Sequence, residues 1–535
     1  MTGTRRPGRS PSAGPAESAE MREIELKFLL EEQPAAIWAR ARRMDPAFTR
    51  PRTRTLVSVY YDTPDRKLRG AGIVLRIRRD GRRWFQTVKA GRNTVGGFTD
   101  VQEVETAAKS ERPDLQSVPD QKLREKLVEL CQGRELVPVS AMQFRRSSGV
   151  IVLPDAAKVE ISTDVGTISA SDLTAPWREL EIERIEGSPR ALFDVAAALH
   201  PDGGLRFSRL SKSARAILLA EEGRVEPLPV PRCAAKVPLA PAMSAEHTAR
   251  DVLRECAGQI VANIDVVRET DRPEGPHQLR IGLRRLRSWL LIFQPLALSA
   301  EMARLSEEAR WLAGEVGSLR DLDVTGSDIV GPEAERHPDE PALAALAQLA
   351  ASRATSRREA LRRTLRDRRV QAFELDLIRF VELRGWIEEG DLDQSRRLST
   401  PVEVFASEAL ARRWKKVLKC GRGLNKLDTA HRHELRKQLK KLRYAIEFFA
   451  PLHETKRCAV MTERLKALQD VFGQLNDAAM VRGVLAGPEF VAPADAQMQR
   501  AVGWVLGATG ARAEQAWTKA SKLWRKLKRS RPFWE

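Results

Sequence analysis

Hydrophobic and polar positions alternate with one period in the first part of the chain and with another in the second. From about Met21 to Glu222, short runs alternate apolar and polar residues, and turn signals such as Asp80-Gly81 separate them. This period of two predicts β-strands. From Ala245 onward, apolar residues recur at i, i+3, i+4 and i+7, which predicts helices. The pattern therefore predicts a β-rich domain followed by an all-helical domain.

Two segments of different composition flank the β-rich domain. Residues 1–20 are rich in Pro, Gly and Ser, and we expect a disordered tail there. Residues 223–244 include the proline-rich run VEPLPVPRCAAKVPLAPAM, which predicts an extended linker. The expected domains are therefore residues 21–222 and residues 245–535.

The net charge of the chain indicates which class of binding partner to expect. Of its 535 residues, 91 are Lys or Arg and 72 are Asp or Glu, so the formal net charge is +19. This surplus favours an acidic partner, which can be nucleic acid, an anionic membrane surface or a polyanionic small molecule. The five cysteines are scattered, without a CxxC motif, which argues against a disulfide framework or a zinc site and fits a reducing compartment. We find no signal peptide and no apolar stretch long enough to span a bilayer, so the expected location is the cytoplasm.

Charged residues follow one another at every second position in several of the predicted strands. Residues two apart in a strand project from the same face. Some strands present only carboxylates, as Glu103 and Glu105 do, whereas others present only cations, as Arg76 and Arg78 do. The solvated face of an ordinary antiparallel sheet gives a similar pattern. The segregation of the two signs instead favours the interior of a barrel that holds a metal-bound polyanion, with carboxylates binding Mg²⁺ or Mn²⁺ and Arg and Lys contacting phosphate.

An ordered set of motifs in this half resembles the CYTH domain of the triphosphate tunnel metalloenzymes. The set begins with the Glu23-x-Glu25-x-Lys27 signature and continues with YYDTPDRKLRGAGIVLRIRRDGRRWFQTVKA at residues 60–90. It goes on with FRR (144–146), VEISTDVGTI (159–168), ELEIE (179–183) and SKSAR (211–215). The resemblance covers about residues 21–220.

The resemblance implies an eight-stranded antiparallel β tunnel that hydrolyses or cyclises triphosphates with a divalent metal. The residues it implies for phosphate contact and catalysis are Lys27, Arg76, Arg78, Lys89, Arg145 and Lys212. The implied metal ligands are Glu23, Glu25, Asp164, Glu179 and Glu181, and Glu183 or Glu160 can replace one of them. Arg145 and Arg146 face oppositely, so only one of them is expected to enter the tunnel.

The chain departs from the family pattern at one position. Family members often have Arg immediately before the first Glu of the strand that here contains Glu103, and this chain has Gln102. A basic contact is then either lost or supplied by Arg92. The departure bears on the identity of the substrate more than on the activity, because the other motif positions are present.

The helical half contains an internal repeat. PHQLRIGLRRLRSWL (276–290) and RHELRKQLKKLRYAI (432–446) share a His, the basic positions that follow it and a leucine stripe. On a helix, positions 0, +3, +7 and +10 form one basic stripe beside the apolar one. The segments that follow, residues 312–324 and 468–480, also match. We therefore expect a duplicated helical bundle, with repeats at about 245–395 and 396–535.

This repeat is similar to the CHAD domain over about residues 245–535. A basic helix stripe taken alone can simply be a solvated face, but here two copies share its phase. The resemblance implies a surface that binds inorganic polyphosphate without catalysis. Its implied residues are His277, Arg280, Arg284, Arg285, Arg287, His433, Arg436, Lys437, Lys440, Lys441 and Arg443. We interpret both histidines as hydrogen-bond donors to phosphate, because neither has a companion at metal-ligand spacing.

The sequence thus predicts a two-domain inorganic triphosphatase that depends on Mg²⁺ or Mn²⁺ and binds polyphosphate through its helical domain, with polyphosphate granules as a place of association. Two alternatives stay open. One is an adenylate cyclase or thiamine triphosphatase of the CYTH type, and the other is a polyphosphate-binding or targeting protein with a weak or inactive tunnel. The sequence argues against a nucleic-acid partner, because it has no RRM, KH or helix-turn-helix signature and only three Tyr for base stacking.

Overall fold

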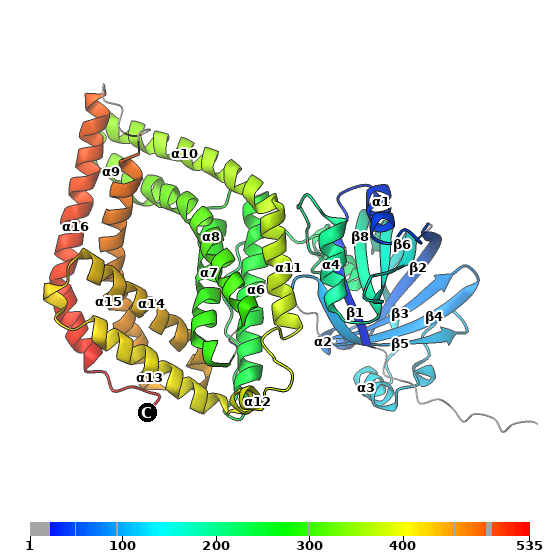
Figure 1. The fold of residues 1–535 in the computed structure, drawn as a ribbon. Helices are drawn as coiled ribbons and strands as arrows, with labels where there is room; N and C mark the ends of the chain where they lie inside the picture. The colour runs from blue at the N-terminus through cyan, green and yellow to red at the C-terminus, as the bar shows by residue number, and fades with distance from the viewer. Residues whose placement is uncertain are drawn as a thin grey trace, which may run out of the picture. The chain divides into compact units, whose positions relative to one another are not determined.

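A computed structural model describes residues 22–48, 50–91, 95–296, 299–453, 455–487, 490 and 495–535. The predicted tail at residues 1–20 and the candidate contact Arg92 lie outside these residues. The chain divides into two compact units (Figure 1). The first contains the described residues up to Leu192 together with Phe207–Pro227, and the second contains Phe193–Arg206 and Leu228–Glu535.

The first unit is a closed antiparallel barrel of eight strands, as predicted. Its strands are neighbours in the order β1-β5-β4-β3-β2-β6-β7-β8. Their bounds are β1 (Arg22–Leu29), β2 (Arg52–Asp62), β3 (Ile73–Asp80), β4 (Arg83–Ala90), β5 (Phe98–Ala108), β6 (Val137–Val152), β7 (Lys158–Ala170) and β8 (Leu173–Glu186). Alternation along each strand sends one set of side chains inward and the other outward. In β8, for example, Glu181 points inward, and the fully buried Leu180 and Ile182 point outward.

One part of the barrel interior is apolar and the other part is charged. Apolar residues of β2, β6, β7 and β8 pack against Ala216 and Leu219 of α5 (Lys212–Glu222). Trp177 and Phe144 lie in this cluster, with their rings edge to face. Helix α5 therefore plugs one part of the barrel with apolar side chains, and the remaining interior is left to charged residues. The other helices of this unit are α1 (Pro34–Met44), α2 (Lys67–Gly70), η1 (Leu115–Ser117) and α3 (Gln121–Cys131).

All the regular elements of the second unit's described residues are helices, as the period of 3.6 predicts. Helix α4 (Arg190–Leu199) begins in the first unit and continues into the second, because the division falls at Phe193. Its helices are α6 (Ala245–Glu269), α7 (Glu274–Ile292), η2 (Gln294–Leu296), α8 (Ala300–Asp323), the π-helical turn η3 (Val324–Val330), α9 (Gly331–Arg336), α10 (Pro341–Arg366), α11 (Arg368–Glu382), α12 (Leu392–Ser399), α13 (Val402–Cys420), η4 (Leu424–Lys426), α14 (Thr429–Phe449), η5 (Ala450–Leu452), α15 (Lys456–Leu485) and α16 (Ala496–Lys528).

The repeated leucines explain where the two related helices, α7 and α14, bury their apolar faces. In α7, Leu279, Leu283 and Leu286 are fully buried, and in α14 so are Leu435, Leu439 and Leu442. Because the leucine stripe of each helix faces the core, the basic stripe beside it lies at the border between the core and the surface. The duplicated sequence therefore gives two helices with the same orientation of charge relative to the core.

Part of the proline-rich segment is held against the helical unit. The backbone N–H of Arg232 donates to Asn263, and the Asn263 amide donates back to the Arg232 carbonyl oxygen at 2.9 Å. The backbone N–H of Ala235 donates to Glu255, which also pairs with the Arg232 guanidinium. This part of the segment therefore follows α6.

All five cysteines are free thiols. Across the described parts of the chain, no helix combines the length and the apolar character needed to cross a membrane.

Candidate functional site

The unplugged part of the barrel is a cavity of about 630 Å³ with charged walls. All eight strands and the start of α5 contribute the charged residues that line it. The acidic ones are Glu23, Glu103, Glu105, Glu160, Glu181 and Glu183, and the basic ones are Arg22, Lys27, Arg54, Arg76, Arg78, Lys89, Arg146, Arg184 and Lys212. Both signs in one enclosed space suit a ligand that combines anionic groups with a cation.

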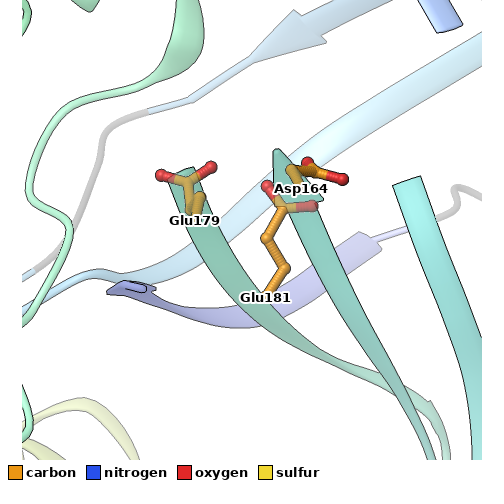
Figure 2. A group of neighbouring side chains, drawn as sticks. All are labelled: Asp164, Glu179 and Glu181. Carbon is orange, nitrogen blue, oxygen red and sulfur yellow. The ribbon is translucent and has the colours of Figure 1, made fainter. Parts of the chain in front are cut away.

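A buried acidic cluster lies on β7 and β8 (Figure 2), the strands that contact α5. It consists of Asp164, Glu179 and Glu181, each of which offers a carboxylate oxygen within 4.8 Å of the others. The ammonium group of Lys212 lies 2.8 Å from Glu179 and 3.2 Å from Asp164, and it also contacts Glu181. Arg146 donates two hydrogen bonds to Asp164, at 2.8 and 2.6 Å, and a further one to Glu181. We call these three carboxylates the inner triad.

Ion pairing controls the protonation of the inner triad. Burial alone would raise the pKa of Glu181, but the charges of Lys212 and Arg146 hold it well below its usual value. Burial would likewise lower the pKa of Lys212, and the neighbouring carboxylates raise it instead. The Glu181 carboxylate and the Lys212 ammonium therefore both carry their charges at neutral pH.

A second group of carboxylates lies beside the inner triad along the same strands. In the ladders, Glu183 of β8 is paired with Glu25 of β1 on one side and with Glu160 of β7 on the other. Burial and the charges of Glu23, Glu25, Glu181 and Glu160 raise the pKa of Glu183 to about 8. We call Glu23, Glu25, Glu160 and Glu183 the outer carboxylates.

The outer carboxylates are only partly neutralised by protein cations. Lys27 lies 2.8 Å from Glu25, and Lys89 pairs with Glu23. Among the described residues, Glu160 and Glu183 have no Lys or Arg within ion-pair distance. The crowding of carboxyl groups that raises the pKa of Glu183, together with their hard oxygen donors, fits a divalent cation of the Mg²⁺ or Mn²⁺ type.

Cations from β3 and β4 form another wall of the cavity. Arg78 donates to Glu105 of β5 at 2.7 Å, and Arg76 lies 3.6 Å from Glu103. Lys89 lies 3.4 Å from Glu103 as well as contacting Glu23. Burial and the charge of Arg76 lower the pKa of Arg78, and the charge of Glu105 opposes this shift. The donors of this wall are of the kind that phosphate oxygens accept.

Two sequence-based expectations need correction. Arg146, not Arg145, enters the cavity, and Arg145 is exposed on the other face of β6. The register explains this, because Arg146 pairs with Asp164 across β6 and β7, and both side chains point inward. Gln102 faces away from the cavity and donates to Asp120 at the start of α3. An Arg side chain at position 102 would also point away from the barrel interior. The presence of Gln at this position therefore removes no contact from the cavity wall.

Arg146 and Arg145 form a matched pair for measuring stability. Replacing Arg146 by Ala leaves the buried carboxylate of Asp164 without its bidentate partner, so we expect the barrel to lose about 3–5 kcal/mol of stability. Replacing the exposed Arg145 by Ala should change it by less than about 0.5 kcal/mol. Calorimetric unfolding of the full chain compares the two variants, and equal shifts would contradict the assignment.

A basic groove of about 860 Å³ lies in the helical unit between α7, α8 and α14. It brings together basic side chains from both repeats and from α8. The basic residues are Arg280, Arg284, Arg287, Arg310, His433, Arg436, Lys437, Lys440 and Lys441. Arg310 was not among the predicted residues because it lies on α8, outside the repeated motif, where sequence comparison of the repeats gives no signal.

The remaining residues predicted for this surface do not line the groove. Arg285 is buried, donates to Gln259 of α6 at 3.2 Å and lies over the ring of Phe448. Arg443 donates to Glu447 at 2.9 Å, and His277 is half-buried outside the groove. Lys441 occupies the repeat position equivalent to Arg285 and does line the groove. The two repeats therefore use the same position differently.

Cations are crowded together in this groove. Burial and the charges of Arg284, Arg436 and Arg280 lower the pKa of Lys440 to about 6. Burial and neighbouring cations also lower the pKa of His433, so its imidazole is mainly neutral at pH 7 and can donate only one hydrogen bond. Lys440 thus lies in a positive field that the carboxylate of Asp477 offsets only in part, and a bound polyanion would relieve it.

Comparisons with known proteins agree with both units. The family model of the CYTH domain matches residues 21–217, and that of the CHAD domain matches residues 251–486. An inorganic triphosphatase of Haemophilus influenzae is 27% identical over 174 residues, which are 31% of this chain and 46% of that protein. The chain therefore spans about half the length of this curated relative.

Solved structures match each unit separately. The CHAD domain from the plant Ricinus communis is 25% identical, with a TM-score of 0.49, over 56% of this chain and 98% of that one. A putative adenylyl cyclase from Hippeastrum, described as having a dominant triphosphatase activity, is 17% identical, with a TM-score of 0.26, over 37% of this chain and 96% of that one. The family matches decide the assignment: this chain contains a CYTH domain followed by a CHAD domain.

Proposed function

We propose that this protein is a divalent-metal-dependent inorganic triphosphatase whose CHAD domain binds inorganic polyphosphate. The observation that carries the proposal is the cavity in which Glu23, Glu160 and Glu183 line the same space as the cations Arg76, Arg78 and Lys89. A triphosphate bound to a metal ion needs both kinds of partner at once. The similarity to the Haemophilus influenzae triphosphatase supports the same reaction class.

The outer carboxylates are the residues that would hold the metal. Glu25 and Glu183 are neighbours across β1 and β8, and Glu160 and Glu23 add oxygens from either side. This choice keeps Glu23 and Glu25 from the expected ligand set and uses Glu160 and Glu183 in place of Asp164, Glu179 and Glu181. When bound, a divalent ion neutralises phosphate oxygens and lowers the pKa of a coordinated water.

The protein cations would bind and align the phosphate chain. Arg76 and Arg78 share one face of β3, and Lys89 lies on the neighbouring strand, so their donors form a continuous row. A bound triphosphate would compete with Glu103 and Glu105 for these cations. Guanidinium groups make paired hydrogen bonds to phosphate oxygens, which holds the chain in line for attack by water. The charge developing on the leaving phosphate would be stabilised by the same groups.

Phosphate release from three substrates tests the proposal. Inorganic triphosphate, ATP and thiamine triphosphate are each incubated with the full chain and Mg²⁺ or Mn²⁺, with a chelator as control. We expect release to be greatest from inorganic triphosphate and to stop in the chelator. Greater release from thiamine triphosphate, or a cyclic nucleotide product from ATP, would select those alternatives. No turnover of any substrate would leave a polyphosphate-binding protein with an inactive tunnel.

The groove supports polyphosphate as the ligand of the CHAD domain. Cations from α7, α8 and α14 surround Lys440, and their spacing along two helices suits a linear polyanion better than a single phosphate. Polyphosphate deposits in the cytoplasm are then the place where we propose the protein acts.

Binding of polyphosphate should take up protons near Lys440. The pKa of Lys440 is lowered to about 6 in the free groove, so its amine is mainly neutral at pH 7.5. A bound polyanion favours the charged form and raises that pKa, so affinity should fall as the pH rises above about 6. Calorimetric titrations in buffers of different ionisation enthalpy measure the uptake. Lys440→Arg should largely abolish it, and an uptake unchanged in this variant would place the proton elsewhere.

A further inference from the structure

Lys212 places a fixed cation at the centre of the inner triad. It is the first residue of α5 and is 8% exposed. Its ammonium group lies 2.8 Å from Glu179 and 3.2 Å from Asp164 and also contacts Glu181. An ammonium has three N–H donors and no acceptor, so three carboxylates around it match its hydrogen-bonding capacity.

The remaining oxygens of the triad are also taken by protein donors. Arg146 bonds both oxygens of Asp164 and one oxygen of Glu181. Glu179 accepts from the hydroxyl of Ser208, and the Arg215 guanidinium lies 3.7 Å from the same oxygen. Arg215 in turn donates to Ser208 at 2.6 Å, which holds this arrangement together.

The charges of the triad are balanced without a metal. Its three carboxylates face Lys212, Arg146 and Arg215, and Lys27 also lies 3.8 Å from Glu181. A divalent ion entering the triad would have to displace the ammonium and would then lie close to two guanidinium groups. The outer carboxylates differ, because Glu160 and Glu183 have no protein cation at ion-pair distance within the described parts of the chain.

We propose that the Lys212 ammonium is a built-in cation of the tunnel, which occupies the inner triad in place of a second divalent ion. The tunnel then binds divalent metal only at the outer carboxylates, with one ion per chain. Through Lys212, helix α5 also joins the strands that carry Asp164 and Glu181. The inference rests on the proposed metal dependence, but it concerns where and how many ions bind, which is measured without turnover.

Counting bound Mn²⁺ tests the proposal directly. Equilibrium dialysis and the electron paramagnetic resonance of Mn²⁺ give the number of ions bound to the full chain without substrate. We expect one ion for the wild type and one for Lys212→Arg, which keeps the charge. Lys212→Met removes the charge at similar length and should open the triad to a second ion. In the double variant Lys212→Met/Glu179→Gln the number should return to one.

Thermal unfolding gives a second test of whether a divalent ion can take the place of the Lys212 ammonium. Without metal, Lys212→Met leaves the triad with more negative than positive charge and should unfold at a lower temperature than the wild type. Adding Mn²⁺ should raise its melting temperature by more than it raises that of the wild type. Equal metal effects in the two proteins would overturn the proposal.

A third variant keeps the proposal testable if Lys212→Met does not fold. Glu179→Gln alone should still bind one Mn²⁺, because the triad holds none in the wild type. Two ions in the wild type and one in Glu179→Gln would overturn the inference. One ion in the wild type and two in Lys212→Met, without phosphate release from any substrate, would sustain the role of Lys212 and overturn the proposed activity instead.

Discussion

Replacing Glu25 by Gln should lower metal-dependent phosphate release from inorganic triphosphate by roughly 10²–10³-fold, the range typical of a single electrostatic group in an active site. Glu25 is 2% exposed and is paired with Glu183 across β1 and β8. The amide keeps the shape of the side chain but removes the negative charge that we assign to metal binding. Initial rates at saturating Mg²⁺ and at several lower concentrations separate weaker metal binding from slower turnover.

The matched control for this variant is Glu186→Gln on the same strand. Glu186 lies at the end of β8, is exposed and pairs with Lys158 at 2.8 Å. It lies outside the cavity wall, so its loss should change the rate by less than about twofold, as an exposed ion pair contributes little. An equal loss of activity in both variants would point to a general effect on the barrel. Full activity of Glu25→Gln would remove Glu25 from the metal site.

The double variant Arg284→Ala/Lys440→Ala should weaken polyphosphate binding by about 100-fold or more. Both side chains line the groove, one from each repeat, so a linear polyanion would contact both. Each charge-assisted hydrogen bond contributes about 1.5–3 kcal/mol, and about 1.4 kcal/mol corresponds to a factor of ten in affinity. Titration of the full chain with a labelled polyphosphate at fixed ionic strength gives the change.

Two exposed cations outside the groove serve as the control for this loss. Arg353→Ala/Lys419→Ala removes the same charge from α10 and α13, where neither residue lines the groove. This variant should bind within about twofold of the wild type. The slope of affinity against salt concentration should also become shallower only in the groove variant, because fewer counterions are released. Equal weakening in both pairs would indicate attraction by net charge without a defined site.

The alternation of charge along the strands was enough to predict a charged barrel interior, but it did not settle which face of each strand points inward. Arg145 and Arg146 illustrate the difference. A period of two places them on opposite faces, and only the pairing of Arg146 with Asp164 across β6 and β7 decides which one enters the cavity. Gln102 shows the same limit, since its side chain faces Asp120 outside the barrel.

The repeated helices show a similar division between local pattern and tertiary packing. The leucine spacing predicts the buried faces of α7 and α14 because every third or fourth residue lies on one side of a helix. Arg285 and Lys441 occupy the same repeat position, but only Arg285 is buried beside Gln259 of α6. The repeat motif determines on which side of its helix a side chain projects. The helix packed against that side determines whether the side chain is buried or lines the groove.

By itself, the sequence determined the two fold classes, the resemblance to CYTH and CHAD domains and the residue types available for metal and phosphate. These follow from local periodicity and from motif order, which need no knowledge of distant neighbours. Only the tertiary structure decided that Lys212 lies within the inner triad, that Glu183 is crowded by carboxylates and that Lys440 lies in a field of arginines. These are effects of charge and burial between segments far apart in the chain, and closure of the barrel and pairing of the helices create them.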